Sequence, residues 1–139
     1  MPFVYAIAFS GDEFVMVRNR RRGWEMPGGV VESGESAEEA VSREFIEETG
    51  MRLRIIANAL IPSGTVFFGM AEKCDESFGC GCSDCGIESS DEIEEVAFFA
   101  RLPEDLSFPR GEYETMLQEG KIAVKKYINR NSIGDSCAT

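Results

Sequence analysis

The segment between Ser36 and Gly50 constrains the fold more than any other part of the chain. Ser36 is followed three residues later by Glu39, which is a capping-box sequence that starts a helix at Ala37. Gly50 supplies a stop signal at the other end. The sequence therefore predicts a helix over residues 37–49 with both of its ends marked.

Three glutamates fall within one turn of this helix. Glu44, Glu47 and Glu48 are spaced i, i+3 and i+4, so their charges repel one another and weaken an isolated helix. On a helical wheel they continue the apolar arc of Ala40 and Val41, whereas a solvated Glu-rich face predicts the opposite placement. Grouped carboxylate oxygens on a buried face favour a hard divalent cation such as Mg²⁺. We therefore interpret the chain as a metal-dependent enzyme.

The chain contains no histidine, and this absence removes several mechanisms. Neither a Ser-His-Asp nor a Cys-His arrangement is available, and a His-ligated catalytic zinc is excluded. A general base has to be Glu, Asp, Lys, Tyr or a metal-bound hydroxide.

Composition and charge narrow the class of protein. The 139 residues are 43% hydrophobic and 28% charged, which suits a single globular domain, residues 1–139. The net charge of −11 argues against binding of duplex nucleic acid, whose affinity comes from an excess of Lys and Arg. No apolar run approaches a membrane span and no signal peptide is evident, so we expect a cytoplasmic protein that does not bind membranes. The sequence leaves open whether it forms a homodimer.

Further elements are predicted on both sides of the helix. Strands are expected over residues 3–9, 13–18, 53–60, 65–70 and 95–100. The first two form a hairpin, and residues 26–29 break regular structure. A helix over about 110–119 is followed by a short helix or strand over 121–128. Residues 129–139 are predicted to be a frayed tail.

The segment from Gly29 to Met51 resembles the Nudix box of the Nudix hydrolase family. That motif is Gly, five residues, Glu, seven residues, Arg-Glu, an apolar residue, any residue, Glu-Glu, any residue, Gly and an apolar residue. The fixed positions are all matched, by Gly29, Glu35, Arg43, Glu44, Glu47, Glu48 and Gly50. The resemblance continues more weakly through residues 24–29 and 95–103. Together these features look like a MutT-type Nudix domain.

The resemblance implies an α+β fold, an α/β/α sandwich around a mixed β-sheet. It also implies hydrolysis of a nucleoside diphosphate linked to another group, with water attacking phosphorus in the presence of Mg²⁺ or Mn²⁺. Carried over to this chain, Glu44, Glu47 and Glu48 become catalytic metal ligands, with Glu44 or a neighbour as the base. The Gly29 carbonyl becomes a further ligand. An acid before the last core strand completes such sites, and we choose Glu92 from the acidic stretch 91–95.

Six residues are assigned supporting or substrate-binding roles. By the same resemblance, Arg43 and Glu35 form an ion pair that orients the helix and its loop. Glu112 falls where MutT-type enzymes present a residue to the nucleobase, and it could accept hydrogen bonds from a guanine edge. An exposed first-turn glutamate favoured by the helix dipole is the alternative. A basic cluster also precedes the box, and from it we predict as substrate-binding Arg18, Arg20 and Arg22; a solvated basic turn is the alternative for each.

The substrate follows by elimination, because the extra signatures of several family branches are absent. The predicted activity is that of a nucleoside triphosphate pyrophosphohydrolase, giving the monophosphate and pyrophosphate, with oxidised nucleotides among the candidate substrates. RNA 5′-pyrophosphohydrolase and NDP-sugar pyrophosphatase activities are alternatives in the same class. Two alternatives from another class are a non-catalytic nucleotide-sensing domain and a zinc-binding interaction module.

Four of the five cysteines lie in an insert over about residues 72–90. A disulfide framework is disfavoured by the odd number of cysteines and by the absence of a signal peptide. Four thiolates could hold one Zn²⁺ tetrahedrally, and reduced thiols in a loop are the alternative. The candidate zinc ligands are Cys74, Cys80, Cys82 and Cys85.

Overall fold

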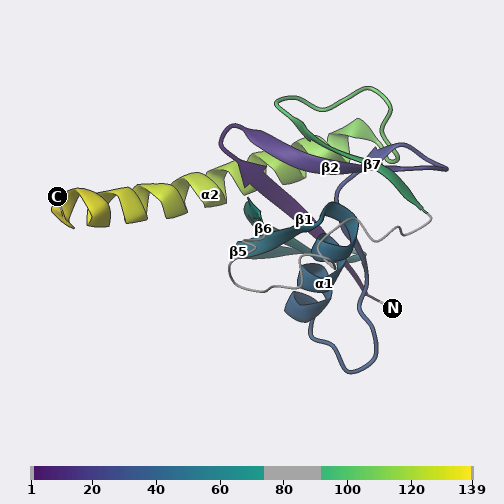
Figure 1. Cartoon of the computed structure of the whole chain (residues 1–139), viewed down its shortest axis with the longest axis horizontal. Helices are drawn as coiled ribbons and strands as arrows, with labels where there is room; N and C mark the ends of the chain where they lie inside the picture. Colours follow the sequence, from purple (N-terminus) through teal and green to yellow (C-terminus); the bar gives the residue numbers. More distant parts are fainter. Residues whose placement is uncertain (1, 74–91, 139) are drawn as a thin grey trace.

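The computed structural model describes residues 2–73 and 92–138 (Figure 1). The strands are β1 Phe3–Ser10, β2 Glu13–Asn19, β3 Trp24–Glu25, β4 Gly28–Val30, β5 Met51–Ile61, β6 Gly64–Lys73 and β7 Ile93–Phe99. The helices are α1 Ala37–Thr49 and α2 Arg110–Ala138. In these described ranges, neither helix has the length and apolar character needed to cross a membrane.

The strands form one mixed sheet in the order β3-β2-β1-β6-β5. β1 is central: it runs parallel to β6 along its whole length and antiparallel to β2 only at the hairpin end, where Ser10 faces Glu13. Beyond that end the two strands diverge. β4 pairs with the start of β1, while β3 and β7 pair with β2. The segment that carries β3 and β4 therefore runs in the fork between β1 and β2.

The two helices cover opposite faces of this sheet (Figure 1). Side chains of a strand alternate between faces, and β1 shows this clearly. Val4 and Ala6 pack in the cluster that contains α1, whereas Ile7 and Phe9 pack in the cluster that contains α2. The predicted α/β/α sandwich around a mixed sheet is confirmed.

The prediction that residues 26–29 lack regular structure is wrong for the two glycines. Gly28 and Gly29 belong to β4 and pair with Tyr5 and Val4 of β1. A Cβ atom at Gly28 would lie 2.1 Å from the Val4 carbonyl oxygen, so only glycine lets the two backbones approach this closely. Glycine usually interrupts a strand, but at these two positions it allows β4 to pair with β1.

The prediction of two separate elements after residue 110 is also wrong, because α2 is one helix that ends at Ala138. Its backbone continues through most of the segment for which the sequence predicted a frayed tail. Gly120 is buried, and a Cβ atom on it would lie 3.0 Å from the Phe68 ring and 3.2 Å from Ile7. This glycine therefore allows the helix to lie close to the sheet and does not end it.

Part of the cysteine-rich insert cannot be compared with the prediction, because residues 74–91 lie outside the described residues. Residues 72 and 73, which the prediction assigned to the insert, are the end of β6. The prediction of a zinc site falls entirely outside the described ranges, since it rests on Cys74, Cys80, Cys82 and Cys85.

We predict that Gly120→Leu lowers the free energy of unfolding by about 1–3 kcal/mol, because the new side chain overpacks the contact between α2 and the sheet. Gly111→Leu is the matched control: it lies in the same helix, and a Cβ atom there meets no atom within 4 Å. The control should be neutral or slightly stabilising, since leucine favours helix more than glycine does. Urea unfolding followed by circular dichroism measures both, and equal effects would contradict the packing role of Gly120.

Candidate active site

The ends of α1 are fixed by the contacts that its sequence predicts. The Ser36 Oγ accepts a hydrogen bond from the Glu39 main-chain N–H at 3.1 Å, and the Ser36 N–H donates to the Glu39 carboxylate at 2.9 Å. Gly50 adopts a left-handed conformation with φ of 74°, and its N–H donates to the Ile46 carbonyl at 2.9 Å. These contacts set where the helix starts and stops, and hence which residues face the sheet.

The glutamates of α1 differ in burial. Ala40, Val41 and Phe45 are fully buried against the sheet, and Glu44 and Glu48 are partly buried beside them. The Glu47 side chain is 51% exposed. The prediction that three carboxylates continue the buried stripe therefore holds for Glu44 and Glu48, whereas Glu47 lies at the rim of this face.

Arg43 connects the helix to the loop before it. Its guanidinium donates to both carboxylate oxygens of Glu35, at 2.7 and 2.9 Å, and to the Val30 carbonyl at 3.3 Å. The same group donates to Glu44 at 2.8 Å and to Glu47 at 3.4 Å. The pKa of Arg43 is raised, mainly by its hydrogen bond to Glu35. In this structure Arg43 supplies the positive charge that offsets the repulsion among the carboxylates.

The carboxylate of Glu44 lies directly against the backbone of Gly29. A Cβ atom on Gly29 would be 2.6 Å from the Glu44 carboxyl carbon, so any larger residue would displace this carboxylate. Burial raises the pKa of Glu44, although its hydrogen bond with Arg43 opposes that shift. The glycine of the box thus leaves room for an acid against the main chain, which puts the predicted Gly29 and Glu44 ligands side by side.

Glu48 is the most desolvated acid of the site. Burial raises its pKa to about 8, and the neighbouring charges of Glu44 and Glu25 add to the shift. The Gly28 N–H donates a 2.9 Å hydrogen bond to its carboxylate, which opposes the shift but does not cancel it. A buried acid whose nearest charged neighbours are other acids is a place where a bound cation would be strongly favoured.

Glu25 is a site residue that the sequence reasoning missed. Its side chain is only 13% exposed, and Arg22 holds it with two hydrogen bonds, at 3.0 and 3.2 Å. It also lies close enough to Glu48 to affect the pKa of that acid. One sequence signal could have identified Glu25. It is an acid between the large apolar residues Trp24 and Met26, both of which are buried.

The predicted substrate-binding arginines have different surroundings. Arg18 pairs with Glu94 at 3.0 Å and with Asp105 at 2.7 Å, and its guanidinium lies over the Trp24 ring at 5.8 Å from the centroid. Arg22 is paired with Glu25, as described above. Within the described ranges, Arg20 has no side-chain ion pair or hydrogen bond, and the same is true of its neighbour Arg21. Substrate binding by Arg18, Arg20 and Arg22 stays a prediction.

Trp24 joins the site to the start of α2. Its N–H donates to the Asp105 carbonyl at 2.7 Å, and its own carbonyl accepts from the Ser107 N–H at 2.9 Å and the Tyr113 hydroxyl at 3.1 Å. The preceding residue, Gly23, packs so tightly that a Cβ atom would lie 2.5 Å from the Asp105 carbonyl oxygen. Glu112, beside Tyr113, is exposed in the first turn of α2, and its role in base recognition stays a prediction.

The structure places Glu92 at the basic turn. Its carbonyl accepts a hydrogen bond from the Arg20 N–H at 2.7 Å. The pKa of Arg22 is raised mainly by Glu25, and the charge of Glu92 contributes to the same shift. Within the described ranges, no three acidic or cysteine side chains already converge on one point as a formed metal site. The role of Glu92 as a metal ligand stays a prediction.

A family model of the Nudix domain matches residues 2–114, and the chain therefore belongs to the Nudix family, as its sequence predicts. The chain is 45% identical over 51 residues to a Bacillus subtilis protein described as "Putative 8-oxo-dGTP diphosphatase YtkD", covering 37% of this chain and 32% of that protein. It is 41% identical over 44 residues to the RNA pyrophosphohydrolase of Baumannia cicadellinicola, covering 32% and 28%. The matches thus span about a third or less of these curated relatives.

Two solved structures cover more of the chain. The crystal structure of the Bacillus subtilis pyrophosphohydrolase BsRppH aligns with a TM-score of 0.60 and 26% identity, covering 90% of this chain and 81% of that one. A Nudix family member from Chromobacterium violaceum aligns with a TM-score of 0.61 over 96% of this chain and 88% of that one. The identity to the second is 20%, so this likeness supports the fold alone.

We predict that Glu35→Gln weakens the folded state at neutral pH and that this effect disappears in acid. The Arg43 hydrogen bonds lower the pKa of Glu35 to about 2 from an ordinary value of 4.5. A lowered pKa stabilises the folded state above pH 4.5, and the stabilisation is lost as the pH falls toward 2. Urea unfolding of both proteins between pH 7 and pH 2 measures the difference in the free energy of unfolding. A difference that does not change with pH contradicts the prediction.

For Glu48 in metal-free protein we predict the opposite effect: its carboxylate lowers the free energy of unfolding as the pH rises. Its pKa of about 8 lies above the ordinary 4.5, so the folded state holds an extra proton between these values and loses stability as the pH rises through them. In the presence of a chelator, Glu48→Gln should raise the free energy of unfolding at pH 8 by up to about 4 kcal/mol. Glu38→Gln, on the solvent side of α1, should leave it unchanged. Equal stability of wild type and Glu48→Gln across this range would contradict the prediction.

Proposed function

We propose that this chain is a Nudix hydrolase that uses Mg²⁺ or Mn²⁺ to cleave a phosphoric anhydride bond in a nucleotide. The observation that carries this proposal is the position of Glu48. It is a carboxylate desolvated beside Glu44 and Glu25 and held by the Gly28 N–H, in a chain that has no histidine. Such a cluster lowers stability on its own, and charge neutralisation by a bound cation supplies a reason for it.

The residues present fit a hard divalent cation. Their donor atoms are carboxylate oxygens of Glu44, Glu47 and Glu48 and the carbonyl oxygen of Gly29, which are the ligand types that Mg²⁺ and Mn²⁺ prefer. When bound, such cations neutralise phosphate charge and lower the pKa of a coordinated water. Glu47 is at the exposed rim, where its side chain can turn inward without disturbing the core. Glu92 is the proposed additional ligand.

The chain's own groups then position the reacting atoms. Arg43 keeps Glu44 against Gly29, and Glu35 keeps Arg43 in place by two hydrogen bonds. Glu44, or a neighbouring carboxylate of the box, accepts the proton of the attacking water. The water oxygen forms a bond to phosphorus while the anhydride P–O bond breaks, and the bridging oxygen of the leaving group keeps that electron pair. Most of the rate gain in such chemistry comes from positioning and charge compensation.

We propose a nucleoside triphosphate as the substrate, with the monophosphate and pyrophosphate as products. The relative YtkD, described as a "Putative 8-oxo-dGTP diphosphatase", supports this choice and makes oxidised purine nucleotides the first candidates. Arg20 and Arg21 lie in the same turn as Arg22, and their side chains have no ion-pair partner among the described residues. They are available to offset phosphate charge in a chain of net charge −11.

A second candidate is removal of pyrophosphate from the 5′ end of RNA. The similarity to the pyrophosphohydrolase BsRppH, with 26% identity over 90% of this chain, supports a pyrophosphohydrolase activity without naming its substrate. The similarity to the RNA pyrophosphohydrolase of Baumannia cicadellinicola, over a shorter segment, favours RNA as the substrate. Both candidates use one site and one reaction, and they differ in what is attached to the ribose of the triphosphorylated nucleotide.

We predict anhydride cleavage of at least one member of a panel, measured as pyrophosphate from dNTPs, 8-oxo-dGTP, NTPs and 5′-triphosphorylated RNA and as nucleoside monophosphate from NDP-sugars. The cleavage should require Mg²⁺ or Mn²⁺ and should stop with a chelator. Glu48→Gln should lower kcat by about 100-fold or more, because a ligand of the cation is lost. The ratio of kcat/KM for 8-oxo-dGTP to that for triphosphorylated RNA decides between the two candidate substrates.

Glu38→Gln serves as the matched control, because it makes the same change on the exposed side of α1. Its activity should equal that of the wild type. Absence of turnover across the panel with both cations would refute the proposed function. Turnover that Glu48→Gln leaves intact would refute the role assigned to this carboxylate.

A further inference from the structure

The outer edge of the sheet is formed by β5, and within the described ranges no strand pairs with that edge. β5 has 11 residues. Its charged residues, Arg52 and Arg54, lie in the first half, and the seven residues 55–61 carry no charge at all. Monomeric proteins usually protect an edge strand with charges, prolines or short length, because its free N–H and C=O groups can pair with another chain. The second half of β5 has no charge and no proline, and its pairing with β6 is irregular only between Ile55 and Ala57, so residues 57–61 are left without this protection.

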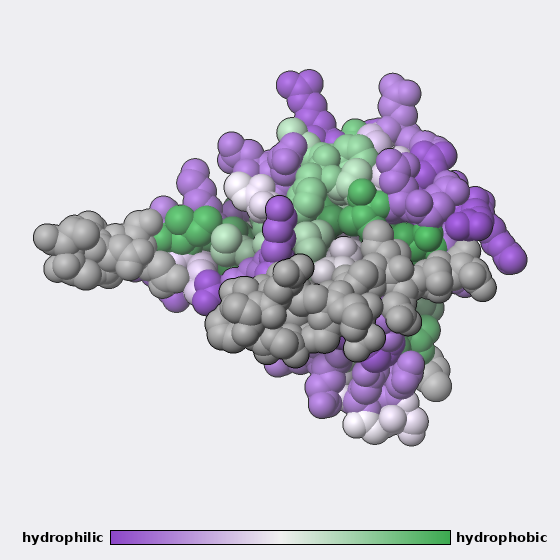
Figure 2. Space-filling model, in the orientation of Figure 1, coloured by the Kyte–Doolittle hydropathy of each residue, from purple (hydrophilic) through white to green (hydrophobic). Residues whose placement is uncertain are grey.

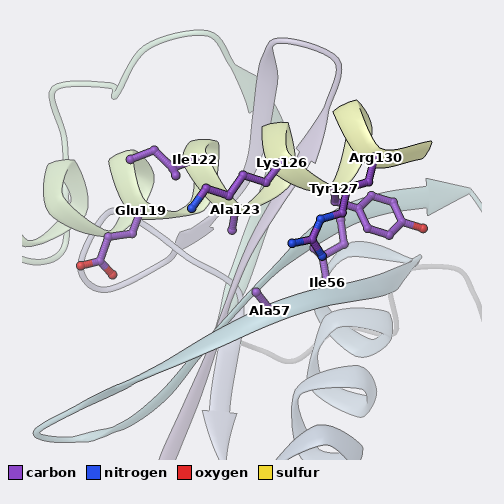
Figure 3. A pocket seen from close by; sticks show the side chains of 8 residues that line it. All are labelled: Ile56, Ala57, Glu119, Ile122, Ala123, Lys126, Tyr127 and Arg130. Carbon is purple, nitrogen blue, oxygen red and sulfur yellow. The ribbon is translucent and has the colours of Figure 1, made fainter. Parts of the chain in front are cut away.

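Apolar surface adjoins the same edge. Leu60 is 84% exposed on the face that carries α1, and Ile122 and Ile128 of α2 are 51% and 43% exposed on the opposite side of the sheet. Figure 2 shows apolar surface on the part of α2 that extends past the sheet. Figure 3 shows a hollow between β5 and α2, with Ile56 and Ala57 contributed by the strand. Exposed apolar groups thus flank the unpaired strand on both faces of the sheet, a combination that marks an interaction surface.

The helix beside this edge is longer than the sheet is wide. A helix of 29 residues is about 44 Å long, and five neighbouring strands span about 20 Å. α2 starts near Trp24, where Tyr113 binds the tryptophan carbonyl, and crosses to β5, so its end projects beyond the sheet (Figure 1). A helix gains most of its stability from packing of one face. A partner that covers the β5 edge would also pack against the projecting helix.

The charges around the hollow identify the partner. Glu119 lies at one end of it, and Lys126 and Arg130 lie toward the other (Figure 3). In a two-fold symmetric dimer the same patch of both copies is in contact, and the two patches run in opposite directions. The acidic end of one copy therefore faces the basic end of the other. The net charge of −11 makes most other surfaces of this chain repel a second copy. This patch is complementary to itself.

We propose that two copies of this chain associate through the second half of β5 and the hollow between β5 and α2. The β5 strands pair antiparallel within residues 55–61. Each α2 extends over its partner, with Glu119 of one copy near Lys126 and Arg130 of the other. This interface lies on β5 and α2, away from the carboxylates of α1, so the proposal does not depend on the proposed function.

Sedimentation equilibrium of the full chain tests the proposal. We expect a concentration-dependent mass that approaches twice the 15.4 kDa of the chain. Leu60→Lys and Lys126→Glu should each raise the dimer dissociation constant about tenfold or more, as loss of central interface contacts does. Lys121→Glu is the matched control, since it reverses a charge on the same helix outside the hollow, and it should have little effect. Combining Glu119→Lys with Lys126→Glu should recover most of the lost affinity.

Amide hydrogen exchange supplies a second readout that does not depend on a variant. The N–H groups of residues 55–61 should exchange more slowly at high protein concentration than at low concentration, while those of β2 should not change. A chain that stays monomeric at roughly 100 µM, well within the range where specific interfaces form, would overturn the proposal. So would a dimer whose dissociation constant is the same for Leu60→Lys, Lys126→Glu and Lys121→Glu.

Discussion

The guanidinium of Arg43 is the interaction on which the site depends. Glutamates spaced one helical turn apart destabilise a helix, and burying two of them adds a desolvation cost. Arg43 offsets both by contacting Glu44, Glu47 and, in the loop before the helix, Glu35. An arginine suits this task because its planar fork donates to several acceptors at once. A cation bound by Glu44 would compete with Arg43 for the same carboxylate, so the two positive charges have to share it.

Close contacts at three glycines are the second constraint on this structure. Gly28 lets β4 pair with β1, Gly29 leaves space for the Glu44 carboxylate, and Gly120 lets α2 lie against the sheet. At each of these positions a Cβ atom would meet another group at 3.0 Å or less. The acidic cluster and the layers that support it therefore depend on missing side chains as much as on the side chains that are present.

The sequence predicted those features of the structure that depend on residues close together in the chain. The ends of α1 followed from Ser36, Glu39 and Gly50, and the acid spacing followed from the box itself. The sequence did not reveal β4 or the continuity of α2, because both depend on glycines whose contacts are distant in the chain. Glu25 escaped notice for the same reason: its proximity to Glu48, 23 positions further along the chain, is created only by the folding of the chain. Ion pairs such as that between Arg18 and Asp105, 87 residues apart, lie beyond any local pattern.

The Trp24 carbonyl accepts two hydrogen bonds, one from Ser107 and one from Tyr113. Glu25 is the next residue along the chain and lies beside Glu48. A change in the tilt of α2 would therefore pull on the peptide that carries Glu25 and shift a negative charge at the edge of the acidic cluster. The hydrogen bond from Tyr113 thus links the position of the long helix to the position of the peptide that carries Glu25. A partner bound to the projecting end of α2 would reach Glu25 only through the Tyr113 hydrogen bond and the peptide between Trp24 and Glu25.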